Sequence, residues 1–211
     1  KDYHCQIKND GKFDSDTYQN VKDEIEKRNS EEEESLHVKY VIPKAGSKIY
    51  LGQAQITFYG PLENNYKYGR QVDLNVRQEN KYSIVTRIVY GKNSFLMTGD
   101  AQRETIEKII KKGYNLQAQV LKEPHHGYQD VKEKDKLIAG RTSDHKLLID
   151  HTKANIAVIS NGYKNTGEVP MKNVLTDLSK MDIYETGNRG TIVITSDGSH
   201  LYVRTEKGGN K

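Results

Sequence analysis

The chain has 211 residues, which is enough for one large domain or for two small ones. Hydrophobic residues make up 34% and charged residues 29%, and no run approaches the roughly 18 apolar residues of a membrane span, so we expect one buried core and no transmembrane segment. The formal net charge of +4 is spread along the chain and is too small to indicate nucleic-acid binding by itself.

Cysteine content and the N-terminal sequence leave the compartment open. The single cysteine, Cys5, excludes an internal disulfide framework and a cysteine-based zinc site. No apolar stretch follows the N-terminus, so we expect no signal peptide in the chain as given. Both a cytoplasmic protein and an exported protein whose signal has been removed fit this pattern.

The first part of the chain predicts one helix followed by strands. Residues 14–29 place Tyr18, Val21 and Ile25 on one face at spacings of three and four, which is typical of an amphipathic helix. Four glutamates at 31–34 end this pattern and predict a solvated loop. Short runs rich in β-branched and aromatic residues then predict strands over 36–42, 48–52 and 55–60.

A polar, irregular stretch comes next, and strands and helices alternate beyond it. Residues 61–80 predict a long surface loop, which in a compact domain is often functional. The elements expected after it are a hairpin over 82–97, a helix over 101–112, a strand over 117–123, a helix within 143–152, a strand over 155–160, a helix over 171–181, the segment DIYET and a closing hairpin over 190–204. This order predicts helices packed on a mostly β core, and hence an α/β layered domain spanning 1–211.

Two polar motifs each follow an apolar run. SFLMTGD ends in Asp100, and LKEPHHG contains His125 and His126. In α/β layered folds, functional side chains gather in the loops past the carboxyl ends of strands, so these residues can converge with the loop after Ser160. A carboxylate with neutral imidazoles suits zinc, manganese or iron. Alternatively, Asp100 caps the following helix and the histidines form a polar turn.

Three stretches together resemble the metallo-β-lactamase fold. They are ENKYSIVTRIVYGKNSFLMTGDAQRETIEKIIKKGYNLQAQVLKEPHHG, IAVISNGYKN and YETGNRGTIVITSDG. More narrowly, they resemble the hydrolase domain of ComEC-type DNA-internalisation competence proteins and their free-standing relatives. The resemblance covers about residues 80–200, and more loosely 36–60. It implies an α/β fold of the αββα sandwich type.

The resemblance also implies a metal site. Carried over residue by residue, Asp100 would bridge two metal ions, Zn²⁺ or Mn²⁺, and His125 would bind one of them. His126 would position the substrate or share the coordination, and is the candidate catalytic residue. Such ions lower the pKa of a bound water, which attacks an ester or phosphodiester. The implied partners are a phosphoester substrate and single-stranded or double-stranded DNA.

The sequence also departs from the family pattern. The family's His-x-His-x-Asp-His motif is absent, so we interpret the chain as the later two-thirds of such a domain, with its N-terminal part missing. The nearest imitation, SDHKLLIDH at 143–151, is expected on a surface helix. Glu168 stands where relatives often have a histidine, and Tyr128 where they have a serine.

Three functions remain open from the sequence. The first is a metal-dependent phosphodiesterase or nuclease-like hydrolase, here as an incomplete domain. The second is a non-catalytic binding module that keeps the sandwich and has lost the chemistry. The third is a DNA-binding surface in which basic residues flank aromatic ones that could stack on bases. Its candidate residues are Tyr66, Lys67, Tyr68, Arg70, Arg77, Lys81, Tyr82 and Arg87.

Overall fold

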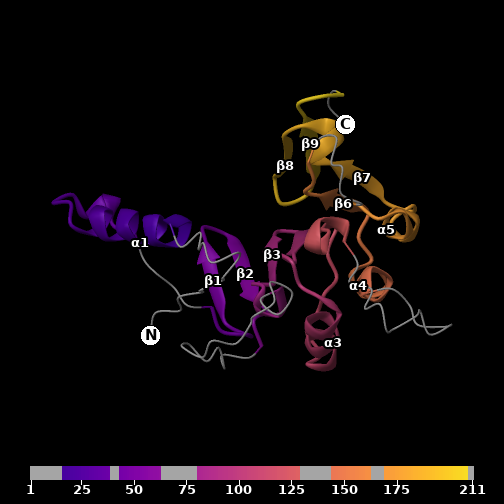
Figure 1. Ribbon diagram of the computed structural model, residues 1–211, viewed down its shortest axis with the longest axis horizontal. Coiled ribbons are helices and arrows are strands. Elements are labelled where there is room, and N and C mark those ends of the chain that lie inside the picture. Colours follow the sequence, from indigo (N-terminus) through magenta and orange to yellow (C-terminus); the bar gives the residue numbers. More distant parts are fainter. Residues whose placement is uncertain (1–15, 39–42, 63–79, 129–143, 163–168, 209–211) are drawn as a thin grey trace. The chain divides into compact units, whose positions relative to one another are not determined.

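The computed structural model describes residues 16–38, 43–62, 80–128, 144–162 and 169–208 (Figure 1). The chain divides into two compact units. The first comprises 1–42 and 63–79, and the second comprises 43–62 and 80–211. Residues 63–79 of the predicted surface loop lie outside the described residues, as do Cys5 and Glu168.

The first unit is described over one helix and a short turn. Helix α1 spans Asp16–Asn29 and confirms the helix predicted at 14–29. The strand predicted at 36–42 is wrong over its described part, because Glu34–Leu36 form a 3-10 helix instead. The physical reason lies in Asn29, whose side chain pairs with both backbone groups of Val38, accepting from its N–H at 2.7 Å and donating to its carbonyl at 3.2 Å. The backbone groups that a strand would use are thereby satisfied locally.

The second unit contains a seven-stranded mixed sheet, so the α/β class is confirmed. The strands lie in the order β1-β2-β3-β4-β5-β6-β7, and they are β1 Lys48–Leu51, β2 Ala54–Phe58, β3 Thr86–Tyr90, β4 Asn93–Met97, β5 Val120–Lys122, β6 Ile156–Ile159 and β7 Asp182–Glu185. The pairs from β1 to β4 are antiparallel, and those from β4 to β7 are parallel. The helices between the parallel strands are α3 Arg103–Lys111, α4 Asp144–Thr152 and α5 Lys172–Asp177.

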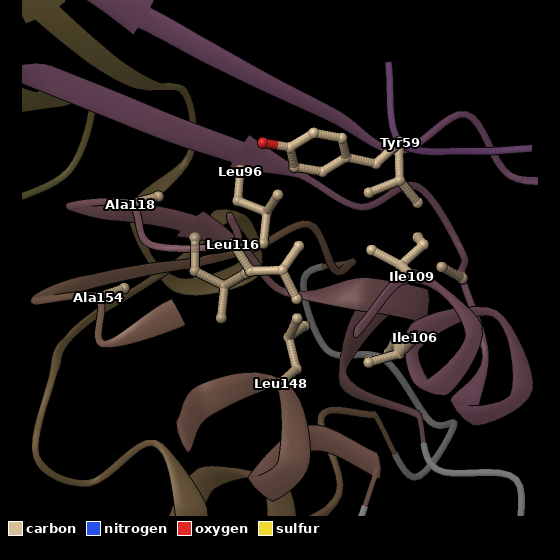
Figure 2. Close-up of a cluster of buried hydrophobic side chains, with 11 residues drawn as sticks. Tyr59, Leu96, Ile106, Ile109, Leu116, Ala118, Leu148 and Ala154 are labelled. Atoms are coloured by element: carbon tan, nitrogen blue, oxygen red, sulfur yellow. The ribbon is translucent and has the colours of Figure 1, made fainter. Parts of the chain in front are cut away.

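One face of the sheet packs against these helices. The register places Leu96, Leu121 and Ala157 in one row across β4, β5 and β6, and each is fully buried. Leu96 and Leu121 pack with Ile106 and Ile109 of α3 and with Leu148 of α4, as Figure 2 shows for most of them. Ala157 and Ile159 pack with Val174 of α5 and with Leu178, the residue that caps its C-terminus. Burying a Leu or Ile side chain of this kind stabilises the fold by about 1.5–3 kcal/mol.

The other face of the sheet is also apolar. A second row crosses six strands and consists of Ile49, Ile56, Ile88, Phe95, Val120 and Ile156. Since side chains alternate along a strand, this row points away from α3, α4 and α5. Val120 is buried, whereas Ile49 retains 40% of its exposure. Over β4, β5 and β6 the sheet is therefore apolar on both faces, which is typical of a sheet with a layer on each side.

A two-stranded hairpin follows helix α6 Thr186–Arg189 and ends the described chain. It pairs β8 Ile192–Ser196 with β9 Leu201–Thr205, as the sequence predicts. Asn93 joins it to the large sheet, because its amide donates to Ser196 Oγ and to the carbonyl of His200, both at 2.8 Å. The turns meet closely: a Cβ atom on Gly91 would lie 2.2 Å from the carbonyl oxygen of Gly198, so this contact requires a glycine.

Helix α4 differs from the expected surface helix. Within SDHKLLIDH, His145 retains 2% of its exposure and Leu148 also 2%, although Lys146 and Asp150 are exposed and form an ion pair. The expectation is wrong for His145 because the carboxylate of Glu123, itself fully buried, gives the imidazole a partner inside the protein. None of the helices in the described ranges has the length and apolar character that a membrane span needs.

Candidate functional site

The Thr98-Gly99-Asp100 turn and the histidine turn lie side by side at the carboxyl ends of β4 and β5. The backbone N–H of His125 donates to the carbonyl of Gly99 at 3.2 Å, which ties the two turns together. Thr98 donates its hydroxyl to the carbonyl of Lys122 at 2.6 Å, and Ser83 accepts from the Asp100 N–H at 3.1 Å. The convergence that the sequence predicts for these two motifs is thus confirmed.

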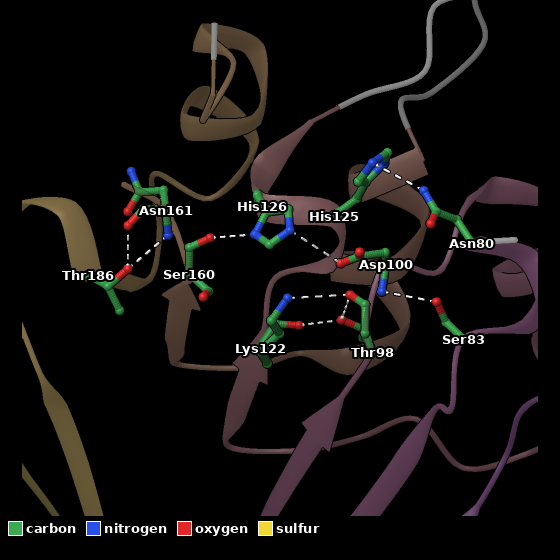
Figure 3. A network of polar contacts seen from close by, with 11 residues as sticks. Asn80, Ser83, Thr98, Asp100, Lys122, His125, His126, Ser160, Asn161 and Thr186 are labelled. Atoms are coloured by element: carbon green, nitrogen blue, oxygen red, sulfur yellow. Dashed lines mark hydrogen bonds and ion pairs between the residues drawn. The ribbon is translucent and has the colours of Figure 1, made fainter. Parts of the chain in front are cut away.

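Asp100 does not occupy the cap position of the following helix. The N-cap of α3 is Gln102, two residues further on. Gly99 has a positive φ of 56°, which turns the chain after β4. The carboxylate of Asp100 keeps 39% of its side-chain exposure and points toward the histidine turn (Figure 3).

His126, rather than His125, faces Asp100. Its Nε2 atom lies 3.6 Å from Asp100 Oδ1, and its Nδ1 atom lies 2.6 Å from the carbonyl oxygen of Ser160 (Figure 3). Because a carbonyl oxygen only accepts, Nδ1 carries the proton of this hydrogen bond. In the neutral ring, Nε2 then presents a lone pair to the carboxylate. A proton on Nε2, a water that donates to both groups, or a metal ion can each satisfy this approach.

His125 faces another direction. Its Nε2 atom lies 3.2 Å from the side-chain amide nitrogen of Asn80, and its ring stacks edge-on against Tyr128 with centroids 5.2 Å apart. Both histidines have left-handed backbones, with φ of 49° at His125 and 58° at His126. This conformation is uncommon for residues other than glycine, and the two adjacent rings lie tilted with their centroids 6.3 Å apart.

Lys122 lies beneath the site at the end of β5. Its ammonium donates to the carbonyl of Gly99 at 3.3 Å. Burial lowers the pKa of Lys122 below its ordinary value, and the nearby carboxylates of Asp100 and Glu123 offset part of this effect. The Lys122 side chain thus ties the end of β5 to the backbone of the Asp100 turn.

The loop after β6 completes the wall beside His126. Thr186 donates its hydroxyl to the carbonyl of Asn161 at 2.7 Å and accepts from the Asn161 N–H at 2.8 Å. The Asn161 side chain in turn accepts from the Gly187 N–H at 2.9 Å. These bonds hold the backbone at Ser160, whose carbonyl orients His126. Neither Thr186 nor Ser83 is predicted from the sequence, because isolated Ser and Thr residues carry no distinctive spacing.

Asp100 and His126 have the right chemistry and spacing for a divalent cation. Tetrahedral zinc with bonds of about 2.0–2.2 Å separates two ligand atoms by about 3.3–3.6 Å, which matches the observed 3.6 Å. An imidazole whose other nitrogen bonds a backbone carbonyl is the usual arrangement of a ligating histidine. Over the described ranges, however, no three His, Cys, Asp or Glu side chains gather into a metal-binding group. Within the described residues the pair therefore offers two ligand atoms, one fewer than a catalytic zinc site uses.

The DNA-binding surface suggested by the sequence is largely outside the described residues. This holds for Tyr66, Lys67, Tyr68, Arg70 and Arg77. Among the described ones, Arg87 shares a face of the sheet with Leu96 and donates its Nε–H to the carbonyl of Gln117 at 2.7 Å.

The sequence was also compared with known proteins. No family model matches it, and no curated protein matches it.

Proposed function

We propose that the chain is part of a divalent-metal-dependent phosphodiester hydrolase, with Asp100 and His126 as two of its metal-binding residues. The observation that carries this proposal is the 3.6 Å approach of two acceptor atoms, one of them on a ring fixed by Ser160. Both side chains stay open to solvent, with 39% and 48% of their exposure retained, so an ion can reach them.

We also propose that the domain has the metallo-β-lactamase type of fold. An αββα sandwich of the metallo-β-lactamase type needs a second apolar layer against the sheet face opposite α3, α4 and α5. The apolar row from Ile49 to Ile156 supports this, because it gives that face an apolar surface across six strands. The resemblance to the ComEC-type hydrolase domain supports it independently through TGD and EPHHG.

The roles follow from the contacts of each residue. Asp100 would supply a carboxylate oxygen and His126 its Nε2 lone pair, while Ser160 would hold the ring in the correct tautomer. When bound, Zn²⁺ or Mn²⁺ supplies an acidified water as the nucleophile. In the resembling family two ions share the aspartate, so Asp100 is the candidate bridge. The substrate class we propose is a phosphodiester, including DNA.

For His125 we propose a different role from the one that the resemblance implies. Its Nε2 atom faces Asn80, so we assign it to the rim of the site, where it could contact the substrate. A catalytic zinc site uses three protein ligands, and the described residues supply two. We therefore expect weak metal binding and slow turnover from this chain.

A hydrolysis assay tests the proposal. The protein would be incubated with bis(p-nitrophenyl) phosphate and with single-stranded DNA, in Mn²⁺, in Zn²⁺ and in a chelator. We expect a slow, metal-dependent release of product that Asp100→Ala and His126→Ala abolish and that Asp150→Ala, a change at the exposed end of α4, leaves intact. A rate that the chelator and both site variants leave unchanged would contradict the proposal and favour a non-catalytic binding module.

A further inference from the structure

Two buried ionisable side chains lie directly behind the histidine turn. Glu123 is the last residue before Pro124 and is fully buried, and His145 on α4 retains 2% of its exposure. His145 Nδ1 and Glu123 Oε1 are in direct hydrogen-bonding contact. Burying such groups costs free energy unless they are paired, so a buried pair at this position suggests a specific role.

The imidazole of His145 spans the turn from one end to the other. Its Nδ1 atom contacts Glu123, which precedes the turn, and its Nε2 atom lies 3.3 Å from the carbonyl oxygen of Tyr128, which follows it. One side chain from another element thus holds both ends of the segment that carries His125 and His126.

The turn between these two anchors is strained. Its two histidines have φ values of 49° and 58°, and a residue other than glycine adopts this conformation only where its surroundings enforce it. The Tyr128 N–H closes the turn by donating to the carbonyl of His125 at 2.8 Å. On the opposite side, the Met171 N–H donates to the carbonyl of Gly127 at 3.0 Å. The backbone conformation that aims His126 at Asp100 is thus held by contacts from outside the turn.

The donors in this arrangement can be counted. The carbonyl of Tyr128 accepts, so the contact at 3.3 Å requires a proton on His145 Nε2. A second proton lies between Nδ1 and Oε1, on one atom or the other. Each nitrogen of the His145 ring therefore makes a different contact. Nδ1 pairs with Oε1 of the buried carboxylate, whose Oε2 has no hydrogen-bond partner among the described residues, and Nε2 holds the far end of the turn.

We infer that His145 is a positioning residue for the metal site, and that it acts on His126 through the Tyr128 carbonyl. This inference rests on the proposed function. The two tasks of the ring can be separated by substitution, because the amide nitrogen of Asn stands where Nδ1 does and that of Gln stands where Nε2 does. His145→Asn keeps the donor to Glu123 and removes the donor to Tyr128. His145→Gln does the reverse.

The two variants should rank differently in stability and in site geometry. We expect the free energy of unfolding to be larger for His145→Asn than for His145→Gln. The reason is that His145→Gln leaves the carboxylate of Glu123 buried without its imidazole partner. In the site we expect the opposite order. His145→Asn should weaken Mn²⁺ binding about tenfold, the lower limit for supporting residues of metal sites, and His145→Gln should stay within about threefold of the parent. His151→Asn, at an exposed position of the same helix, should change neither property.

A metal-free measurement separates this inference from the proposed function. Hydrogen exchange of the Tyr128 amide reports on closure of the turn, and in His145→Asn we expect it to be about tenfold faster at unchanged global stability. If the parent protein binds no Mn²⁺ but Tyr128 exchange follows the predicted order, the proposed function fails and the positioning stands.

Two results would overturn the inference. One is the same ranking of the variants in stability and at the site, which would mean a purely structural role. The other is Tyr128 exchange and Mn²⁺ affinity in His145→Asn equal to those of the parent. Should His145→Gln not fold, the decision rests on His145→Asn compared with His151→Asn, and equality of these two would overturn the inference equally.

Discussion

His126 Nε2 approaches Asp100 Oδ1 to 3.6 Å, while the other nitrogen of the same ring is held by the carbonyl of Ser160. The pair links the end of β4 with the turn after β5, and the contact to Ser160 adds the end of β6. Three neighbouring strands thus meet in one polar cluster, at the sheet edge where α/β folds place their functional side chains.

The two adjacent histidines should differ in their effect on metal binding. His126→Gln removes the lone pair that faces Asp100, so we expect the affinity for Zn²⁺ to fall at least about tenfold. His125→Gln changes a ring that faces Asn80, and we expect its affinity to stay within about threefold of the parent. Calorimetric titration of both variants gives the comparison, and equal losses, or a larger loss for His125→Gln, would restore His125 as the ligand.

Gly127 should tolerate a side chain much less well than Gly113. Both have positive φ, 77° and 75°, so alanine costs about 1–2 kcal/mol of backbone strain at either site. A Cβ atom at Gly113 meets nothing within 4 Å, whereas at Gly127 it would lie 2.7 Å from the Cβ atom of Pro170. We expect Gly127→Ala to lose about 1–3 kcal/mol more than Gly113→Ala in urea unfolding. Similar losses would show that the histidine turn has room to move.

The bond between the large sheet and the hairpin should contribute measurably to stability. Asn93 retains 4% of its exposure and donates twice to the hairpin. Asn93→Ala removes two part-buried hydrogen bonds of about 0.5–1.5 kcal/mol each, a total loss of about 1–3 kcal/mol. Arg204→Ala, on the exposed side of β9, should lie within about 0.5 kcal/mol of the parent. Urea unfolding gives the free energy of unfolding of both variants. A loss for Asn93→Ala no larger than that for Arg204→Ala would show that Asn93 does not stabilise the contact between the sheet and the hairpin.

The hairpin turn should make stability sensitive to acid. The N–H groups of His200 and Ser199, followed by the side chains of His200 and Tyr202, hold the pKa of Asp197 well below its ordinary value of 3.8. A lowered carboxyl pKa contributes stability above the unfolded pKa, and that stability is lost as pH falls below 3.8.

Asp197→Asn separates this effect from that of other carboxylates. Asparagine keeps an oxygen that accepts from the Ser199 and His200 N–H groups but cannot be protonated in this range. Between about pH 5 and pH 3, we expect the parent to lose more stability than the variant. Parallel pH profiles of the two proteins would contradict this.

Much of the fold can be predicted from apolar patterning. The buried row of Leu96, Leu121 and Ala157 comes from three short apolar runs, and the stripe of α3 from isoleucines three residues apart. The strand predicted at 36–42 fails over its described part, 36–38, because the Asn29 side chain replaces strand pairing at Val38. A contact across nine residues leaves no periodic signal.

The sequence predicts which residues make up the candidate site, but it does not predict how they are arranged. The positions of Asp100, His125 and His126 after strands indicated that they meet. Which ring faces Asp100 depends on two left-handed backbone angles, and sequence pattern does not predict these for residues other than glycine. The pairing of Glu123 with His145 was missed for a related reason. Both read as ordinary polar residues, and their contact exists only after β5 and α4 have packed.

The central claim is that Asp100 holds a divalent cation together with His126, and calorimetric titration with Zn²⁺ tests it most directly. We predict saturable binding of one ion by the parent protein, with affinity reduced at least about tenfold in Asp100→Asn at unchanged folding. Absence of saturable binding by the parent, or equal affinity in the two proteins, would contradict it.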